Sequence, residues 1–188
     1  MRWIARDVTF DFPRPMVVMG IVNTTPDSFA DGGRFPDTDS AVDHALRLAD
    51  EGAEIIDIGG ESTRPGSDPV SAEEELRRVI PVIERLHDAL SIPISIDTYK
   101  ARVAARALAA GAAMVNDIWG FLRDADMSAV VAEAGVPVVL MHNQDHTRYT
   151  DLVPDVIGAL SRMSQVAVEA GVAFENIILD PGMGFGKT

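Results

Sequence analysis

The sequence predicts an α/β fold, a TIM (β/α)8-type barrel of which about the first six βα units are present as one domain over residues 1–188. Three observations predict it. Short, continuously apolar runs alternate with amphipathic helices that end near glycine. The runs do not alternate apolar with polar residues, as strands with one solvated face would. Each run ends in or is followed by a polar residue, which is typical of barrel strands at their carboxyl ends.

Six runs are expected to form buried parallel strands. They are Met16–Val22, Glu54–Ile58, Ile94–Asp97, Met114–Asn116, Val136–Met141 and Ile177–Asp180. Apolar residues spaced three and four apart predict the helices between them, which end near Gly52, Gly111, Gly135 and Gly171. A barrel needs eight such units and about 250 residues, so two strands and their helices are expected to be missing.

Two of the helices carry more specific start signals. Ser71 and Glu74 form a capping box ahead of an apolar stripe. Pro81 lies within that stripe and predicts a kink or a late start. The helix that begins near residue 100 is expected to be capped by Asp97 or Thr98.

Polar residues at the strand ends favour a barrel over a doubly wound sheet. A barrel brings groups from several strands to one mouth, whereas a doubly wound sheet gathers them near one switch point. Here each of the six predicted strands has its own polar residue at or just past its carboxyl end: Asn23, Asp57, Asp97, Asn116, His142 and Asp180. This even spread predicts a single rim of polar side chains.

Composition excludes several classes of protein. The chain has no cysteine, so it has neither a disulfide nor a thiolate metal site, and a reducing cytoplasm is its expected location. Its first residues contain no long apolar run, and no segment approaches the roughly 20 apolar residues of a membrane span. A net charge of −13 argues against a nucleic-acid partner but leaves a small anionic substrate open.

The polar loops 23–33 and 57–66 and three strand-end residues are candidates for ligand binding, although a polar loop is ordinarily only a loop. Arg64 stands among glycines and hydroxyl side chains, a setting suited to gripping an anion, although a surface arginine in a turn would look the same. Asp97, Asn116 and Asp180 end separate strands and could ring a flat heterocycle rich in N–H donors. A single such residue is usually a helix cap, but three at one barrel mouth are harder to explain in that way.

Two further patterns are interpreted as loops, the first as a glycine-lined loop that packs against a ligand. The segment that ends in Gly186-Lys187-Thr188 is similar to a P-loop, but the motif requires glycine at position 181, which is proline. His142 and His146 have the spacing of a helical metal pair, yet they follow a strand directly and lack the glutamate of the HExxH motif.

Six blocks, in order, resemble the dihydropteroate synthase family. Met19–Phe29, MGIVNTTPDSF, is similar to the first signature of that family, and Asp57–Gly66, DIGGESTRPG, is similar to its second. Four shorter blocks match in register around Asp97, Asn116, Met141 and Asp180. The resemblance runs from about residue 16 to the last residue. Two long motifs and four short ones in the same order are very improbable by coincidence.

The resemblance implies an activity and a set of site residues. The family condenses 6-hydroxymethyl-7,8-dihydropterin diphosphate with 4-aminobenzoate to give dihydropteroate and diphosphate, and sulfonamides target it. By motif, Asn23 would bind the Mg²⁺ that bridges the leaving diphosphate, and Asp97 and Arg64 would be catalytic. The other substrate contacts implied are Thr63, Asn116, Asp180, Ile118, Met141, Phe185, Thr25, Pro26, Asp27, Ser28, Phe29 and Pro65.

The sequence departs from the family in one respect, and it leaves alternatives open. It lacks the Ser-Arg-Lys motif of the seventh family strand and the Arg-x-His motif of the eighth, so this chain alone is expected to be inactive or severely impaired. The alternatives are a methyltetrahydrofolate-binding corrinoid methyltransferase domain and a non-catalytic structural fragment. An open barrel also exposes strand edges, which leaves a homodimer or a strand-swapped assembly open.

Overall fold

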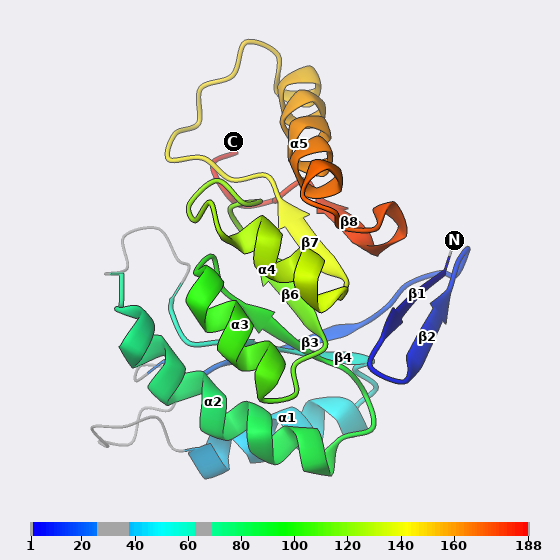
Figure 1. The fold of residues 1–188 in the computed structure, drawn as a ribbon, viewed down its shortest axis with the longest axis vertical. Coiled ribbons are helices and arrows are strands. Elements are labelled where there is room, and N and C mark those ends of the chain that lie inside the picture. Colours follow the sequence, from blue (N-terminus) through cyan, green and yellow to red (C-terminus); the bar gives the residue numbers. More distant parts are fainter. Residues whose placement is uncertain (1, 26–37, 63–68, 188) are drawn as a thin grey trace.

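The structure is a computed structural model, and it describes residues 2–25, 38–62 and 69–187 (Figure 1). Its strands are β1 (Arg2–Ala5), β2 (Val8–Asp11), β3 (Met19–Asn23), β4 (Ile55–Gly59), β5 (Ile94–Asp97), β6 (Met114–Asp117), β7 (Val138–Met141) and β8 (Ile177–Asp180). Its helices are α1 (Thr38–Asp50), α2 (Ala72–Ala89), α3 (Ala101–Ala109), α4 (Met127–Ala134), α5 (Leu152–Glu169) and the short 3₁₀ helix η2 (Phe174–Asn176).

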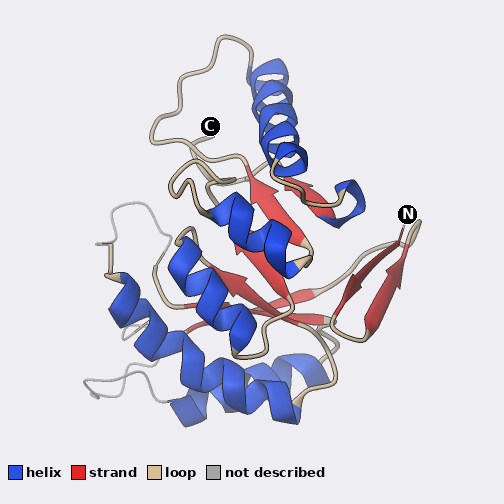
Figure 2. Ribbon diagram, viewed as in Figure 1, coloured by secondary structure: helices blue, strands red, loops and turns tan. Residues whose placement is uncertain are grey.

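The strand order confirms the barrel-type prediction. Strands β3 to β8 form one parallel sheet in which each strand pairs with the next one along the chain. A doubly wound sheet would contain a switch point, with neighbours that are not consecutive. Helices α1 to α5 lie on one side of the curved sheet (Figures 1 and 2). Within the described residues β3 and β8 remain the edges of the sheet.

Two predicted strands begin later than expected, and each has a local reason. The first begins at Met19 instead of Met16. The carbonyl of Val18 accepts the N–H of Glu54, and the regular pairing of β3 with β4 begins only at the next residues, Met19 and Ile55. The fifth begins at Val138 instead of Val136. Pro137 has no N–H to donate to a ladder, although its carbonyl accepts from Val115.

The antiparallel hairpin β1–β2 was not predicted. Trp3 and Phe10 stack with their ring centroids 4.2 Å apart, and both rings are buried. They form a separate apolar cluster with Ile55, Met114 and Val139, which come from β4, β6 and β7. The hairpin therefore covers the inner face of the sheet at the amino ends of the strands, which leaves the carboxyl ends for a site.

The helix starts were predicted in part. Ser71 caps α2, and its hydroxyl accepts the N–H of Glu74 at 3.2 Å. The helix begins at Ala72, directly after this cap, and continues through Pro81, so the predicted late start is wrong. The predicted cap of α3 is right only in part. The hydroxyl of Thr98 accepts the N–H of Lys100, just ahead of the helix, at 3.1 Å. The first N–H of the helix itself, that of Ala101, donates to the Asp124 carboxylate at 2.8 Å. None of the helices in the described ranges is long and apolar enough to cross a membrane.

Candidate active site

The two faces of the sheet separate the polar strand-end residues into two groups. Ile55, Met114 and Val139 lie on the inner face, against the hairpin, and so do the residues two or four positions away from them in the same strands. The residues between them, such as Ile56 and Val115, pack beneath the helices in the main core. Because side chains alternate along a strand, Asp57, Asp97 and Asn116 lie on the inner face, and Asp117 lies on the outer one.

The strand register arranges these inner residues in rows. Asn23 of β3 is level with Gly59 of β4, Gly59 with Asp97 of β5, and Asp97 with Asn116 of β6. One step deeper, Asp57 is level with Ser95. Five polar side chains and one glycine thus lie within two neighbouring rows at the carboxyl ends of four strands.

Gly59 opens the upper row. A Cβ atom at this position would stand 3.3 Å from the Asn23 Oδ1 atom and 3.4 Å from the Asp97 Oδ2 atom. A larger side chain would therefore press on both polar groups. The missing side chain leaves the amide of Asn23 and the carboxylate of Asp97 facing each other across β4.

The lower row contains a buried carboxylate with one unused oxygen. Asp57 is 2 % exposed, and its Oδ2 atom accepts a hydrogen bond of 2.9 Å from the amide of Asn116. Among the described residues, neither its Oδ1 atom nor the Oδ1 atom of Asp97 has a hydrogen-bond partner, and both atoms are buried. Buried acceptors without partners are rare in folded proteins, so these two oxygens are suited to a ligand that carries N–H donors.

The electrostatics of the two carboxylates favour the same kind of ligand. Burial raises the pKa of Asp57, although the nearby polar side chains of Ser95 and Asn116 partly oppose the rise. Burial raises the pKa of Asp97 well above its ordinary value, and the negative charge of Asp57 raises it further. A bound group with N–H donors or positive charge would relieve both effects.

Asp180 lies at the end of β8, which pairs with β7 at the edge of the sheet, and begins a tight loop. Its Oδ1 atom accepts the N–H of Gly182 at 2.7 Å. Gly182 has a φ angle of +67°, and a Cβ atom there would stand 2.2 Å from the carbonyl oxygen of His142, so only glycine fits. The amine of Lys187 donates to the carbonyls of His142 and Phe185 at 3.1 and 2.8 Å. These contacts fix the loop between Asp180 and Lys187, which carries Phe185.

The remaining predicted residues fall into three groups. Ile118 and Met141 are buried at the ends of β6 and β7, as is Thr25 after β3. Asn23 and Phe185 are more accessible. Pro26, Asp27, Ser28, Phe29, Thr63, Arg64 and Pro65 lie outside the described residues.

Sequence analysis missed the roles of Asp57 and Gly59 and the neighbouring Asp117. The sequence predicts Asp57 at a strand end but does not include it among the site residues. Gly59 stands two residues after Asp57 and therefore on the same face of the strand, and this spacing could have indicated that Asp57 faces inward. Asp117 does act as a loop cap, since its carboxylate accepts the N–H groups of Trp119 and Phe121 at 2.8 and 2.9 Å. Burial raises its pKa to about 6.

The described residues contain no cluster of three or more histidine, cysteine or acidic side chains that could hold a metal ion. His142 follows β7 directly, and His146 is exposed in an irregular segment, as predicted. A magnesium ion carried by a phosphorylated substrate needs only one or two protein oxygens, because it keeps several waters. The accessible amide oxygen of Asn23, at the rim of the site, fits that requirement.

Comparison with known proteins agrees with this geometry. Residues 19–188 match the family model described as pterin binding enzyme. A dihydropteroate synthase from Clostridium beijerinckii is 54 % identical over 179 residues, which cover 95 % of this chain and 66 % of the relative. The chain therefore spans just under two thirds of that relative.

Two solved structures from Xanthomonas albilineans are similar over the whole of this chain. A dihydropteroate synthase with 4-aminobenzoic acid has a TM-score of 0.93 and 49 % identity, and this chain covers 68 % of it. A dihydropteroate synthase in complex with 7,8-dihydropteroate has a TM-score of 0.89 and 46 % identity, with the same share of 68 % covered. The curvature and strand order of the sheet are thus those of a TIM-type barrel, of which this chain has six units.

Proposed function

The chain belongs to the pterin binding enzyme family, and from this premise we propose that its 188 residues act as one pterin-binding domain of a dihydropteroate synthase. In the proposed reaction the amine of 4-aminobenzoate attacks the methylene carbon of 6-hydroxymethyl-7,8-dihydropterin diphosphate. A C–N bond forms, the C–O bond to diphosphate breaks, and the amine loses a proton. The relatives named above favour this reaction over methyl transfer from methyltetrahydrofolate.

One observation carries the proposal, namely the two buried carboxylate oxygens without partners at the inner strand ends. The edge of a pterin ring presents several N–H donors, and Asp97 Oδ1 and Asp57 Oδ1 are acceptors in need of donors. In this proposal Asp97, Asn116 and Asp180 hydrogen-bond the ring. The side chains of Ile118, Met141 and Phe185 form the apolar surroundings.

The same groups suit the chemistry of the step. Departure of diphosphate leaves positive charge on the pterin methylene group, and the Asp97 carboxylate offsets that charge. We propose that Arg64 and Thr63 contact the diphosphate, and that Thr25, Pro26, Asp27, Ser28, Phe29 and Pro65 border the aminobenzoate. Asn23 would hold Mg²⁺, which would absorb the charge of the leaving diphosphate. Attack by the aryl amine then needs positioning more than a strong base.

The proposal also covers partners, location and the turnover of this chain. Its partners are the two small substrates and a second copy of the chain, in a homodimer or by exchange of strands; neither nucleic acid nor membrane is among them. Ile21 of β3 is 60 % exposed and Leu179 of β8 is 45 % exposed, which supports contact at the sheet edges. The proposed location is the cytoplasm. These 188 residues alone are expected to turn over slowly or not at all, because they lack the two further family motifs.

Pterin binding tests the site separately from turnover. Calorimetry should show that the folded chain binds 6-hydroxymethylpterin, and that Asp97→Asn weakens this binding at least tenfold. Asp88→Asn changes an exposed aspartate of α2 in the same way and should leave the affinity unchanged. Equal affinity for both variants, or no binding by folded wild-type chain, would refute the proposed site. Formation of dihydropteroate with Mg²⁺ is then assayed as a separate question.

A further inference from the structure

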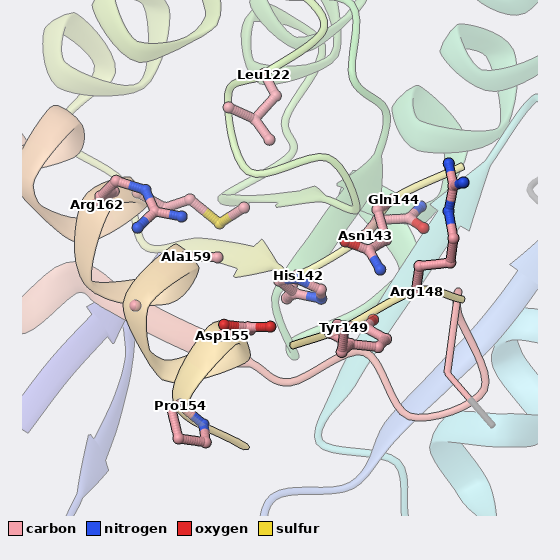
Figure 3. Close-up of a pocket in the computed structure, with 12 residues that line it drawn as sticks. Leu122, His142, Asn143, Gln144, Arg148, Tyr149, Pro154, Asp155, Ala159 and Arg162 are labelled. Atoms are coloured by element: carbon pink, nitrogen blue, oxygen red, sulfur yellow. The ribbon is translucent and has the colours of Figure 1, made fainter. Parts of the chain in front are cut away.

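A pocket of about 420 Å³ lies outside the residues assigned to the pterin site (Figure 3). Its walls come from the segment after β7, from α5 between Pro154 and Met163, and from Leu122 of the loop after β6. In Figure 3 His142 stands near its centre, between the side chains of Arg162 and Arg148. The pocket shares no residue with the set proposed to bind the pterin or the aminobenzoate.

Contacts among the described residues fix the walls of this pocket. Arg123 pairs with Asp145 at 3.0 Å, which joins the loop after β6 to the segment after β7. The hydroxyl of Tyr149 donates to the carbonyl of Gly186 at 2.7 Å. The carboxylate of Asp155 accepts the N–H groups of Thr150 and Asp151 at the start of α5. A pocket with walls held in this way costs little ordering free energy when a ligand binds.

The charge of the pocket is opposite to that of the protein. The chain has a net charge of −13. Both Arg148 and Arg162 line the pocket, and among the described residues neither guanidinium group forms an ion pair or a hydrogen bond. Asp155 is the acidic residue of the lining, and backbone N–H groups already engage its carboxylate. The cavity therefore has two cationic side chains whose donors are available.

Gly158 allows one of these cations to enter the cavity. The nearest atom to a Cβ placed at Gly158 is Nη1 of Arg162, at 3.4 Å, so the guanidinium folds back along α5 over the glycine. Leu122, Ala159 and Met163 supply apolar surface around it. A planar guanidinium beside apolar side chains is suited to a carboxylate that carries a compact apolar body.

We propose that this pocket binds a small organic monoanion, a carboxylate on a compact apolar or aromatic body, with Arg162 as its principal charge partner. The single charge follows from Asp155 in the same wall, which disfavours a dianion. His142 is 4 % exposed, and its ring lies 6.1 Å from the ring of Tyr149, centroid to centroid. The two rings form the floor of the pocket. The inference does not depend on the proposed function.

The probe is 4-fluorobenzoate, observed by fluorine NMR with the folded 188-residue chain. Saturating 6-hydroxymethylpterin, diphosphate and the neutral sulfonamide sulfanilamide occupy the pterin, diphosphate and aminobenzoate parts of the proposed active site during the titration. Arg162→Gln should weaken binding at least tenfold, because a charge-assisted hydrogen bond is lost. Arg106→Gln, which changes an exposed arginine of α3, should leave the affinity within twofold.

Further arms separate this site from the proposed active site. Arg64→Gln should not change the affinity for 4-fluorobenzoate, and the neutral 4-fluorobenzamide should bind at least tenfold more weakly than the acid. Ala159→Leu narrows the pocket without a change of charge and should also weaken binding, which covers the case that Arg162→Gln does not fold. The proposal is overturned if 4-fluorobenzoate does not bind at millimolar concentration. It is equally overturned if Arg64→Gln alone reduces binding, or if acid and amide bind alike.

Discussion

Replacement of Lys100 by methionine should destabilise the chain strongly, and in a way that depends on pH. The amine of Lys100 lies 2.5 Å from the Glu75 carboxylate and also pairs with Glu61. The side chain of Glu75 is 1 % exposed, that of Glu61 is 12 % exposed, and that of Lys100 is 15 % exposed. Tyr99 donates to Glu61 as well, at 2.9 Å. Lys100 is the cation of this largely buried cluster.

The structure limits the size of the effect. Without Lys100, Glu75 stays buried and must either remain charged without a counter-ion or take up a proton. Uptake of a proton costs about 1.4 kcal/mol for each pH unit above the ordinary glutamate pKa of 4.5. The free energy of unfolding should therefore fall by about 3 kcal/mol at pH 7, within the range typical of a broken buried pair, and by less than about 1 kcal/mol at pH 5.

The sign of this pH dependence follows from linkage. Burial already raises the pKa of Glu75 while Lys100 opposes the rise; loss of Lys100 leaves burial unopposed. An acid whose pKa is higher in the folded state loses stability as pH rises from its ordinary value toward the folded value. The variant should thus lose stability, relative to the wild type, between pH 4.5 and pH 7.

Urea unfolding followed by circular dichroism at pH 5 and pH 7 measures the effect. Arg102→Met breaks the exposed Arg102–Glu73 pair, in which both side chains are 64 % exposed, and should leave the free energy of unfolding nearly unchanged at either pH, because solvent screens the pair. Lys100→Met combined with Glu75→Gln should remove the extra pH dependence. If Lys100→Met lowers the free energy of unfolding equally at both pH values, the argument is refuted. It is also refuted if this variant is as stable as the wild type at pH 7.

Three further predictions concern other contacts. Carboxyl carbon NMR should give Asp117 a pKa of about 6, because burial raises it, and a value near 4 would contradict that effect of burial. Arg6→Ala removes hydrogen bonds to two carbonyls at the end of α2, that of Leu90 at 2.7 Å among them, and should lower the free energy of unfolding by about 1–3 kcal/mol in urea titrations; no loss would mean that the hairpin does not rely on them. Gly60→Ala puts a methyl group 2.8 Å from Glu75 Cγ and should cost about 1–3 kcal/mol in the same assay, whereas an unchanged midpoint would show that α2 can shift.

Local patterns predicted the parts of the fold that local physics determines. Continuous apolar runs predicted all six parallel strands, and Ser71 predicted the first residue of α2. The cap of α3 could not be found in this way, because Asp124 lies 23 residues after the N–H that it accepts. The hairpin was missed for a similar reason: its four-residue strands are too short for a clear alternation, and Trp3 is buried by Ile55 and Met114, which are distant in sequence.

The candidate site shows the same limit at the level of neighbouring residues. Asn116 and Asp117 are both polar and both end β6, and sequence alone does not say which of them faces inward. The register decides, because Asn116 is level with Asp97 and donates to Asp57, whereas Asp117 turns outward to cap a loop. A strand-end carboxylate is therefore a site residue only when its position has the inner phase of its strand. That phase depends on what packs against the opposite face, which here is a core built by five helices.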